Sequence, residues 1–406
     1  MTRLASVTVP VLLGALLLGT AGPVALASPT SDARIAQGIA TRVGNPALGT
    51  DVTVHVRNLR SDSTIASRSA DERQVPASTM KVVTAATALM VYGESRRFAT
   101  RVVAGADANR IILVGGGDPL LTRGQLAELA QRTAKSLRKS QVTSAVVDVD
   151  DYLFPHPSDA PGWAPGDRPT YAAAVRPLAL FGEYSNDTVA TAWSFFVQSL
   201  QEAGVRARVG SRILTPQGAD RVAQVRPNTL REAVDVMLRV SENNVAEVLF
   251  RQVALGRGYP ATWSGGSAAA KEVLRDLGLA TWRLALIDGS GLSSDDRLTA
   301  RFLTELLDIA VGSPALDALI EGLPVAGRSG TLINRFAAPP ASCARGEVAA
   351  KTGSLTGVST LAGITRGDDG QWRSFAVLVN RRPAAYPTSS TSLAIDTLAA
   401  VVQGCA

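Results

Sequence analysis

The sequence predicts an α+β fold in which one domain is interrupted by another. Residues 51–56 alternate apolar and polar side chains as a strand does, and two more strand patterns, 357–365 and 374–380, lie near the other end of the chain. Helical patterns fill most of the sequence between them. Part of that region instead mixes short apolar runs with helices, so we expect an inserted α/β domain at 97–224.

The elements expected in chain order follow from the periodicity and from the turn residues between them. They are a helix from Pro76 to about Met90, an apolar run at 110–114, a helix at 124–138, a strand at 145–149, a loop at 155–169, a helix at 191–203, a strand near 205–209, helical patterns at 232–255 and a last helix at 391–402. The first helix has almost no polar face, so we expect it to be buried. Residues 28–96 and 225–406 then form one discontinuous domain with a single insertion.

Composition excludes several classes of function. Of the 406 residues, 46% are hydrophobic and 19% are charged, which is typical of a globular chain and not of a disordered one. The net charge is +6, but only five of the 41 basic residues are Lys, and the excess of Arg and Ala is typical of a GC-rich genome. We therefore expect no nucleic-acid partner and at most a peripheral attraction to an anionic membrane or envelope surface.

The N-terminus has the pattern of a secretory signal peptide. Arg3 precedes an apolar stretch, Val7 to Leu18, and Ala25-Leu26-Ala27 is a small-x-small cleavage site. We expect residues 1–27 to be removed and the mature protein to be secreted to the cell envelope. Two prolines in this segment disfavour the alternative, an uncleaved membrane anchor. No later segment has the 18 or so uninterrupted apolar residues that a spanning helix needs.

The chain has two cysteines, Cys343 and Cys405. In an exported protein, a lone pair of cysteines is typical of one disulfide bond. A metal site needs more ligands than the two histidines, His55 and His156, can add. We therefore expect a Cys343–Cys405 disulfide, no metal and no other cofactor.

Three short motifs point to serine chemistry. They are Ser78-Thr79-Met80-Lys81, Ser241-Glu242-Asn243 and Lys351-Thr352-Gly353. A spacing of three on a helix places Ser78 and Lys81 on one face, where an amine can take the hydroxyl proton. The ordinary pKa of lysine is about 10.4, so a base at neutral pH needs burial or a second cation, for which Lys351 is the candidate. Ser78 also lies at the helix start, where free N–H groups favour a developing anion.

A second Ser-x-x-Lys, from Ser136 to Lys139, shows that this motif alone is not specific. It falls on the polar side of an amphipathic helix, where a solvated surface explains it. Ser78 and Lys81 lie instead in apolar surroundings, and the other two motifs each occur once. A histidine-based triad is not supported, because no Gly-x-Ser-x-Gly is present and neither histidine is well placed to act as a base.

On these motifs the chain resembles the low-molecular-mass penicillin-binding proteins of the class C type, the D-Ala-D-Ala carboxypeptidases and endopeptidases with an inserted domain. The resemblance covers nearly all of the mature chain and includes five segments: 75–81, 241–247, 288–293, 115–119 and 330–336. The family more often has Asp where this chain has Glu242, whose side chain is expected to point away from the site. The implied fold is a serine β-lactamase/transpeptidase-like domain, an antiparallel sheet plus a helical cluster.

The resemblance implies catalysis through an acyl-enzyme on peptidoglycan stem peptides ending in D-Ala-D-Ala. Ser78 is the implied nucleophile and Lys81 its base. Ser241 is the implied relay of a proton to the leaving amine, and Asn243 binds the substrate amide and Lys81. Lys351 keeps the local field positive and orients Ser241.

Substrate binding is assigned in the same way. Thr352 and Ser354 receive the terminal carboxylate, with Gly353 between them, and the backbone N–H groups of Ser78 and Ser354 form the oxyanion hole. β-Lactam antibiotics are the implied covalent inhibitors. Trp163 and Tyr171, in the loop-rich part of the insertion, are interpreted as ordinary packing residues in preference to walls of the substrate groove.

Two other functions remain as alternatives. A serine β-lactamase shares the motifs, but such enzymes keep a compact domain, and the long insertion argues against this alternative. A non-catalytic peptidoglycan-binding module is the second, and the intact motifs argue against it. The sequence leaves the balance between carboxypeptidase and endopeptidase activity open, because both cleave after a D-alanine through the same acyl-enzyme.

Overall fold

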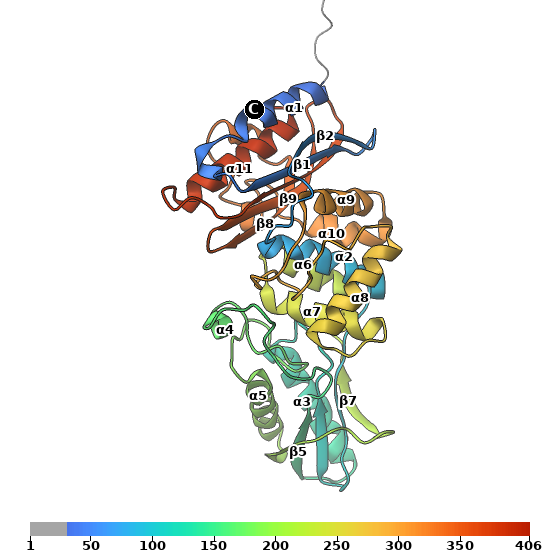
Figure 1. Ribbon diagram of the computed structural model, residues 1–406. Coiled ribbons are helices and arrows are strands. Elements are labelled where there is room, and N and C mark those ends of the chain that lie inside the picture. Colours follow the sequence, from blue (N-terminus) through green and yellow to red (C-terminus); the bar gives the residue numbers. More distant parts are fainter. Residues whose placement is uncertain (1–30) are drawn as a thin grey trace, which may run out of the picture.

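Two five-stranded sheets with a cluster of helices between them make up residues 31–406, which are the residues that this computed structural model describes (Figure 1). The expected signal peptide, residues 1–27, lies outside this range. Helices α1 (Ser31–Arg42) and α11 (Thr388–Gln403) cover the outer face of the first sheet. Within residues 31–406, no helix is long and apolar enough to cross a membrane.

The first sheet joins the two ends of the described chain. Its strands, in the order β2-β1-β10-β9-β8, are all antiparallel to their neighbours. They are β1 (Val52–Asn58), β2 (Ser63–Arg68), β8 (Val348–Leu355), β9 (Val358–Arg366) and β10 (Trp372–Val379). The strands expected at 51–56, 357–365 and 374–380 are therefore present as β1, β9 and β10. The sequence analysis did not identify β2 or β8.

Both faces of β1 are covered, and its apolar and polar side chains pack on different faces. Val52, Val54 and Val56 belong to the core beneath α1 and α11. His55 points to the other face, where its Nδ1 lies 2.6 Å from Thr304 Oγ1 on α9 (Ala300–Val311). Burial and the nearby Arg301 lower the pKa of His55 to about 4. This histidine is therefore neutral and structural.

The helical cluster packs against the inner face of this sheet (Figure 1). It consists of α2 (Met80–Tyr92), α6 (Leu230–Arg239), α7 (Asn243–Gly256), α8 (Trp263–Asp276), α9 and α10 (Asp317–Gly322). Every residue of α2 from Met80 to Leu89 is buried, as its sequence predicted. The helical pattern expected at 232–255 is two helices, because the chain breaks at 240–242, where Ser241 has a φ of +64°.

Five short 3-10 turns complete the helical structure of the described range. They are Pro46–Leu48, Ala77–Thr79, Pro314–Leu316, Gly330–Leu332 and Ala341–Ala344. The turn at Ala77–Thr79 leads directly into α2. It is important for function because it carries the serine of the first motif.

The second sheet lies within the segment between α2 and α6. Its strands, in the order β6-β5-β4-β3-β7, are β3 (Thr100–Ala104), β4 (Arg110–Val114), β5 (Ser144–Asp150), β6 (Arg206–Arg212) and β7 (Arg221–Val225). Strand β5 is parallel to β4 and β6, whereas β3 is antiparallel to β4 and β7. Helices α3 (Arg123–Lys139) and α5 (Thr188–Glu202) share one core with this sheet, and a single turn, α4 (Asp167–Thr170), ends the expected loop. The boundaries at 97 and 224 stay a prediction about an independent domain.

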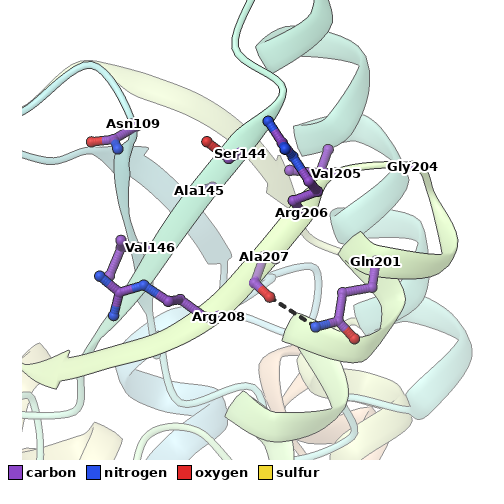
Figure 2. Close-up of a pocket in the computed structure, with 10 residues that line it drawn as sticks. All are labelled: Asn109, Ser144, Ala145, Val146, Gln201, Gly204, Val205, Arg206, Ala207 and Arg208. Carbon is purple, nitrogen blue, oxygen red and sulfur yellow. Dashed lines mark hydrogen bonds between the residues drawn. The ribbon is translucent and has the colours of Figure 1, made fainter.

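A surface hollow of about 690 Å³ lies along the edge strand β6 (Figure 2). The Gln201 side chain donates a hydrogen bond of 2.8 Å to the Ala207 carbonyl there. The exposed side chains of Arg206 and Arg208 also line it. None of the three sequence motifs contributes to this hollow, so the chemistry must lie elsewhere.

The two cysteines form a disulfide bond, Cys343–Cys405, which is the expected pairing. It links the turn before β8 to the residues after α11. The bridged residues are 62 positions apart.

We predict that replacing both cysteines by serine lowers the free energy of unfolding by about 4 kcal/mol, because the unfolded chain loses a covalent loop. Urea unfolding followed by circular dichroism measures this change. Ser342→Ala is the matched control, since it lies beside Cys343 and leaves the bond intact. Equal unfolding midpoints for the double variant and the wild type would contradict the prediction.

Candidate active site

Ser78 and Lys81 meet at the start of α2. Ser78 lies in the turn Ala77–Thr79, and Lys81 is on the first turn of the helix. Lys81 is completely buried, and its Nζ donates a hydrogen bond of 2.9 Å to Ser78 Oγ. Ala77 has a φ of +46°, an uncommon conformation for a residue with a side chain. The surrounding structure therefore imposes the backbone that presents Ser78.

The Ser-x-Asn motif occupies the break between α6 and α7. Lys81 Nζ donates to Asn243 Oδ1 at 2.7 Å, and Lys351 Nζ donates to Ser241 Oγ at 2.9 Å. Glu242 points away from these groups, as expected, and its carboxylate accepts hydrogen bonds from the Tyr184 hydroxyl at 2.9 and 3.0 Å. The break thus lets Ser241 contact Lys351 while Asn243, two residues later, contacts Lys81.

Strand β8 brings the Lys-Thr-Gly motif against the turn that carries Ser78. A Cβ added at Gly353 would lie 2.8 Å from Pro76 O and 3.0 Å from Ser78 N. Contacts this short leave no room for a side chain, so glycine permits the close approach. Lys351 is completely buried in this contact.

The free side of β8 presents N–H groups toward the site. Ala350 N donates to Pro324 O at 2.9 Å on the side away from β9. N–H groups two and four residues further along a strand point in the same direction, so those of Thr352 and Ser354 also face away from β9. Thr352 Oγ1 donates to Thr331 Oγ1 at 2.8 Å.

Two lysines and three carboxyl groups are buried together here. Burial lowers the pKa of Lys81, whereas Glu247 and Asp288 raise it. Burial, followed by the charge of Lys81, holds the pKa of Lys351 well below its ordinary value. Burial and then Asp288 raise the pKa of Asp296 well above the ordinary value of an aspartate. Burial therefore lowers the affinity of both amines for a proton.

An open cavity of about 610 Å³ gives access to Ser78. Asn243, Ser354 and Leu292 line it, and so does Tyr171 from the insertion. Tyr171 is 57% exposed, and its carbonyl accepts a hydrogen bond of 2.8 Å from Asn243 Nδ2. It is therefore a wall of the cavity, and interpreting it as a packing residue was wrong.

Trp163 differs from Tyr171. It packs against the helical core, and its Nε1 donates to Asp288 Oδ2 at 2.8 Å. Packing is therefore the correct interpretation for this residue, although its hydrogen bond also ties the insertion to the loop beneath Lys81.

The structure brings the three motifs together and leaves the other candidates apart. Ser136 and Lys139 lie on α3 in the insertion, and Lys139 is exposed. In residues 31–406, no group of three or more His, Cys, Asp or Glu side chains is arranged to hold a metal ion. The sequence analysis gave no role to Thr331, Glu247 or Asp288. The only available signal for them was that all three lie in segments that carry the family resemblance.

Comparisons with known proteins agree with this arrangement. The model of the D-Ala-D-Ala carboxypeptidase 3 (S13) family matches residues 35–191 and 181–401. The chain is 34% identical over 411 residues to Carboxypeptidase DacB of Mycolicibacterium smegmatis, an alignment that covers 94% of this chain and 87% of the relative. It is 27% identical over 477 residues to a D-alanyl-D-alanine carboxypeptidase of an Actinomadura species, with 94% and 87% of the two chains covered.

Solved structures show the same fold. The crystal structure of penicillin binding protein 4 (dacB) from Haemophilus influenzae superposes with a TM-score of 0.76 at 22% identity, covering 91% of this chain and 98% of that one. A second structure of that protein, complexed with a β-lactam, has a TM-score of 0.70 at 22% identity, with 90% and 98% covered. The predicted α+β transpeptidase-like fold is confirmed. With the family model and a full-length relative both matching, this chain belongs to the D-Ala-D-Ala carboxypeptidase 3 (S13) family of serine peptidases.

Proposed function

We propose that this chain hydrolyses the terminal D-alanyl-D-alanine bond of peptidoglycan stem peptides outside the cytoplasm, through an acyl-enzyme on Ser78. The observation that carries this proposal is the 2.9 Å hydrogen bond between Ser78 Oγ and the completely buried Lys81 Nζ. A serine hydroxyl is a weak nucleophile unless a base lies beside it, and burial favours the neutral amine that such a base requires. The D-Ala-D-Ala carboxypeptidase names of the relatives support this substrate.

Acylation begins when the Lys81 amine takes the Ser78 hydroxyl proton. Ser78 Oγ then forms a bond to the carbonyl carbon of the penultimate D-alanine. The C–N bond to the terminal D-alanine breaks, and the leaving amine receives a proton through Ser241. The contact between Ser241 and Lys351 suits this relay, because Lys351 can replace the proton that Ser241 gives up.

Charge that develops on the substrate carbonyl needs donors already in place. The N–H groups of Ser78 and Ser354 are the proposed oxyanion hole, supported by the close approach of β8 to Ser78 N and by the outward direction of the Ser354 N–H. One such donor is worth about 3 kcal/mol in other acyl-transfer enzymes. The Ser354 and Thr352 hydroxyls are proposed to donate to the terminal carboxylate, with the Thr352 hydrogen turning from Thr331 Oγ1 to the substrate.

Water completes the reaction by hydrolysing the ester and freeing Ser78. A β-lactam forms the same ester, but its leaving amine stays tethered and blocks water. Rapid turnover of a chromogenic cephalosporin would favour the β-lactamase alternative. Failure to release D-alanine from a diacyl-D-Ala-D-Ala peptide would favour the non-catalytic alternative.

We predict that benzylpenicillin forms a one-to-one adduct on Ser78, because its strained amide mimics the D-Ala-D-Ala bond. Intact-mass spectrometry and peptide mapping measure this adduct. Ser78→Ala should abolish it completely, whereas Ser136→Ala, the matched control in the second Ser-x-x-Lys, should retain it. An adduct that survives in Ser78→Ala would refute the assignment of the nucleophile.

We predict that Lys351→Gln moves the acid limb of the pH–acylation profile to higher pH by about one pH unit. Lys81 acts as the neutral amine. Burial and then repulsion between the two lysines lower the pKa of Lys351, and the same repulsion disfavours a proton on Lys81 while Lys351 is charged. Removing that charge raises the pKa of Lys81, so the active form appears only at higher pH. The acylation rate with a fluorescent penicillin, measured across pH, tests this. Lys271→Gln on α8 is the control, and a shift to lower pH would contradict the prediction.

We predict that the chain cleaves cross-linked dimer peptides at least as well as free pentapeptides. The region between α2 and α6 contains a single sheet, and we propose that this leaves the flank of the cavity open to bulkier strands. Digestion of purified peptidoglycan, with products identified by mass spectrometry, compares the two substrates. Poorer cleavage of the cross-linked dimers would count against an open flank.

A further inference from the structure

The dipeptide Gly289-Ser290 bridges the two helices that carry the reacting groups. On the α2 side, Lys81 Nζ donates to Ser290 O at 2.9 Å, and Thr84 Oγ1 donates to Gly289 O at 2.6 Å. On the α7 side, Gly289 N and Ser290 N each donate to one oxygen of Glu247 at 2.9 Å. All four polar backbone atoms of this dipeptide therefore have a partner on one of the two helices.

Glu247 and Asn243 lie one turn apart on α7, so they share a face of the helix. Asn243 contacts Lys81 directly, at 2.7 Å. Glu247 reaches the same amine through the Ser290 carbonyl. Glu247 is completely buried, and burial and then Asp288 raise its pKa. The two N–H donors and the charge of Lys81 act in the opposite direction, because each favours the carboxylate.

The loop that holds this dipeptide is closely packed against α7 and against the turn that carries Ser78. A Cβ at Gly289 would lie 2.4 Å from Ala246 O on α7, and a Cβ at Gly291 would lie 1.9 Å from Ala77 O, next to Ser78. Asp288 fixes the rest of the loop, because its two oxygens accept hydrogen bonds of 2.7 Å from Gly291 N and Ser293 N. A change at Glu247 is therefore transmitted to the position of the Ser290 carbonyl.

We infer that Glu247 is a positioning residue for acylation, which holds the Ser290 carbonyl where it accepts a hydrogen bond from Lys81 and so directs the amine at Ser78 Oγ. This inference rests on the proposed function. Glu247 does not touch the substrate or the reacting atoms, so its role is to orient the base and to supply a negative charge close to it.

The charge makes this role distinguishable from simple support of the fold. The charges that act on Lys81 are those of Glu247 on α7, of Asp288 and Asp296 in the loop before α9, and of Lys351 on β8, together with that of Glu242, which precedes α7 and points away. Of the four carboxyl groups, Glu247 raises the pKa of Lys81 most. Removing its charge should make Lys81 lose its proton at lower pH, which is the opposite of the effect expected for Lys351→Gln.

The test is the rate at which purified full-length Glu247→Gln is acylated by a fluorescent penicillin across pH. A glutamine amide offers one acceptor and places its NH₂ against an N–H donor, so the dipeptide loses at least one hydrogen bond. We expect acylation to slow by about 10-fold to 100-fold, with the acid limb moved to lower pH by about one pH unit. Glu247→Asp keeps the negative charge on a side chain that is too short to bond both N–H groups. It should slow acylation with little movement of the acid limb of the pH profile.

The matched control is Asp308→Asn, a half-buried carboxyl on α9 that bonds Arg57 and Ser374 away from the site. It should leave the acylation rate and the acid limb unchanged. Wild-type behaviour of a folded Glu247→Gln overturns the inference. The inference is also overturned if Glu247→Gln slows acylation equally at all pH values, or if Asp308→Asn slows acylation by the same factor.

If Glu247→Gln does not fold, Thr84→Val decides the question. It removes the hydrogen bond to Gly289 O from the other helix and keeps every charge. Slower acylation with an unmoved acid limb supports the inference, and an unchanged rate overturns it. Failure of the proposed function gives a different result, because the wild-type chain itself would then carry no penicillin on Ser78.

Discussion

The site depends on burying the Lys81 amine without leaving it unpaired. Its three hydrogen bonds go to Ser78 Oγ, Asn243 Oδ1 and Ser290 O, and these acceptors come from three separate segments of the chain. An uncompensated buried charge costs about 3–5 kcal/mol, so α2, α7 and the loop at 288–293 are each held in place by the same group. The fold and the reactivity of Ser78 are therefore coupled, since the packing that buries the lysine also lowers its affinity for a proton.

The second lysine extends this coupling to the sheet. Lys351 is buried on β8 and bonded to Ser241, so the edge of the sheet is tied to the break between α6 and α7. Gly353 lets the strand approach the turn that carries Ser78. The cavity thus lies where the sheet meets the helical cluster. The helical layer supplies Ser78, Lys81 and Ser241, and the sheet supplies Lys351 and Ser354.

The segment between α2 and α6 contributes to the cavity as well as lying beside it. Asn243 Nδ2 donates to the Tyr171 carbonyl, Trp163 donates to Asp288, and Ala173 N donates to Asn244 Oδ1 at 2.7 Å. These contacts all reach the segments that position Lys81. A segment held in this way is fixed relative to the reacting groups, so changes within it are expected to alter the shape of the cavity.

The sequence by itself determined the motif residues, the buried helix α2, the pairing of the cysteines and the strands β1, β9 and β10. Each of these is encoded by side-chain type or by local spacing. Only the tertiary structure decided that 348–355 is a strand, because its Lys-Thr-Gly-Ser run has no apolar alternation and becomes a strand by pairing with β9. The same holds for the break at 240–242 and for the third acceptor of Lys81. That acceptor is the backbone carbonyl of Ser290, and since every residue has such a carbonyl, only the packing of α2 against α7 selects this one.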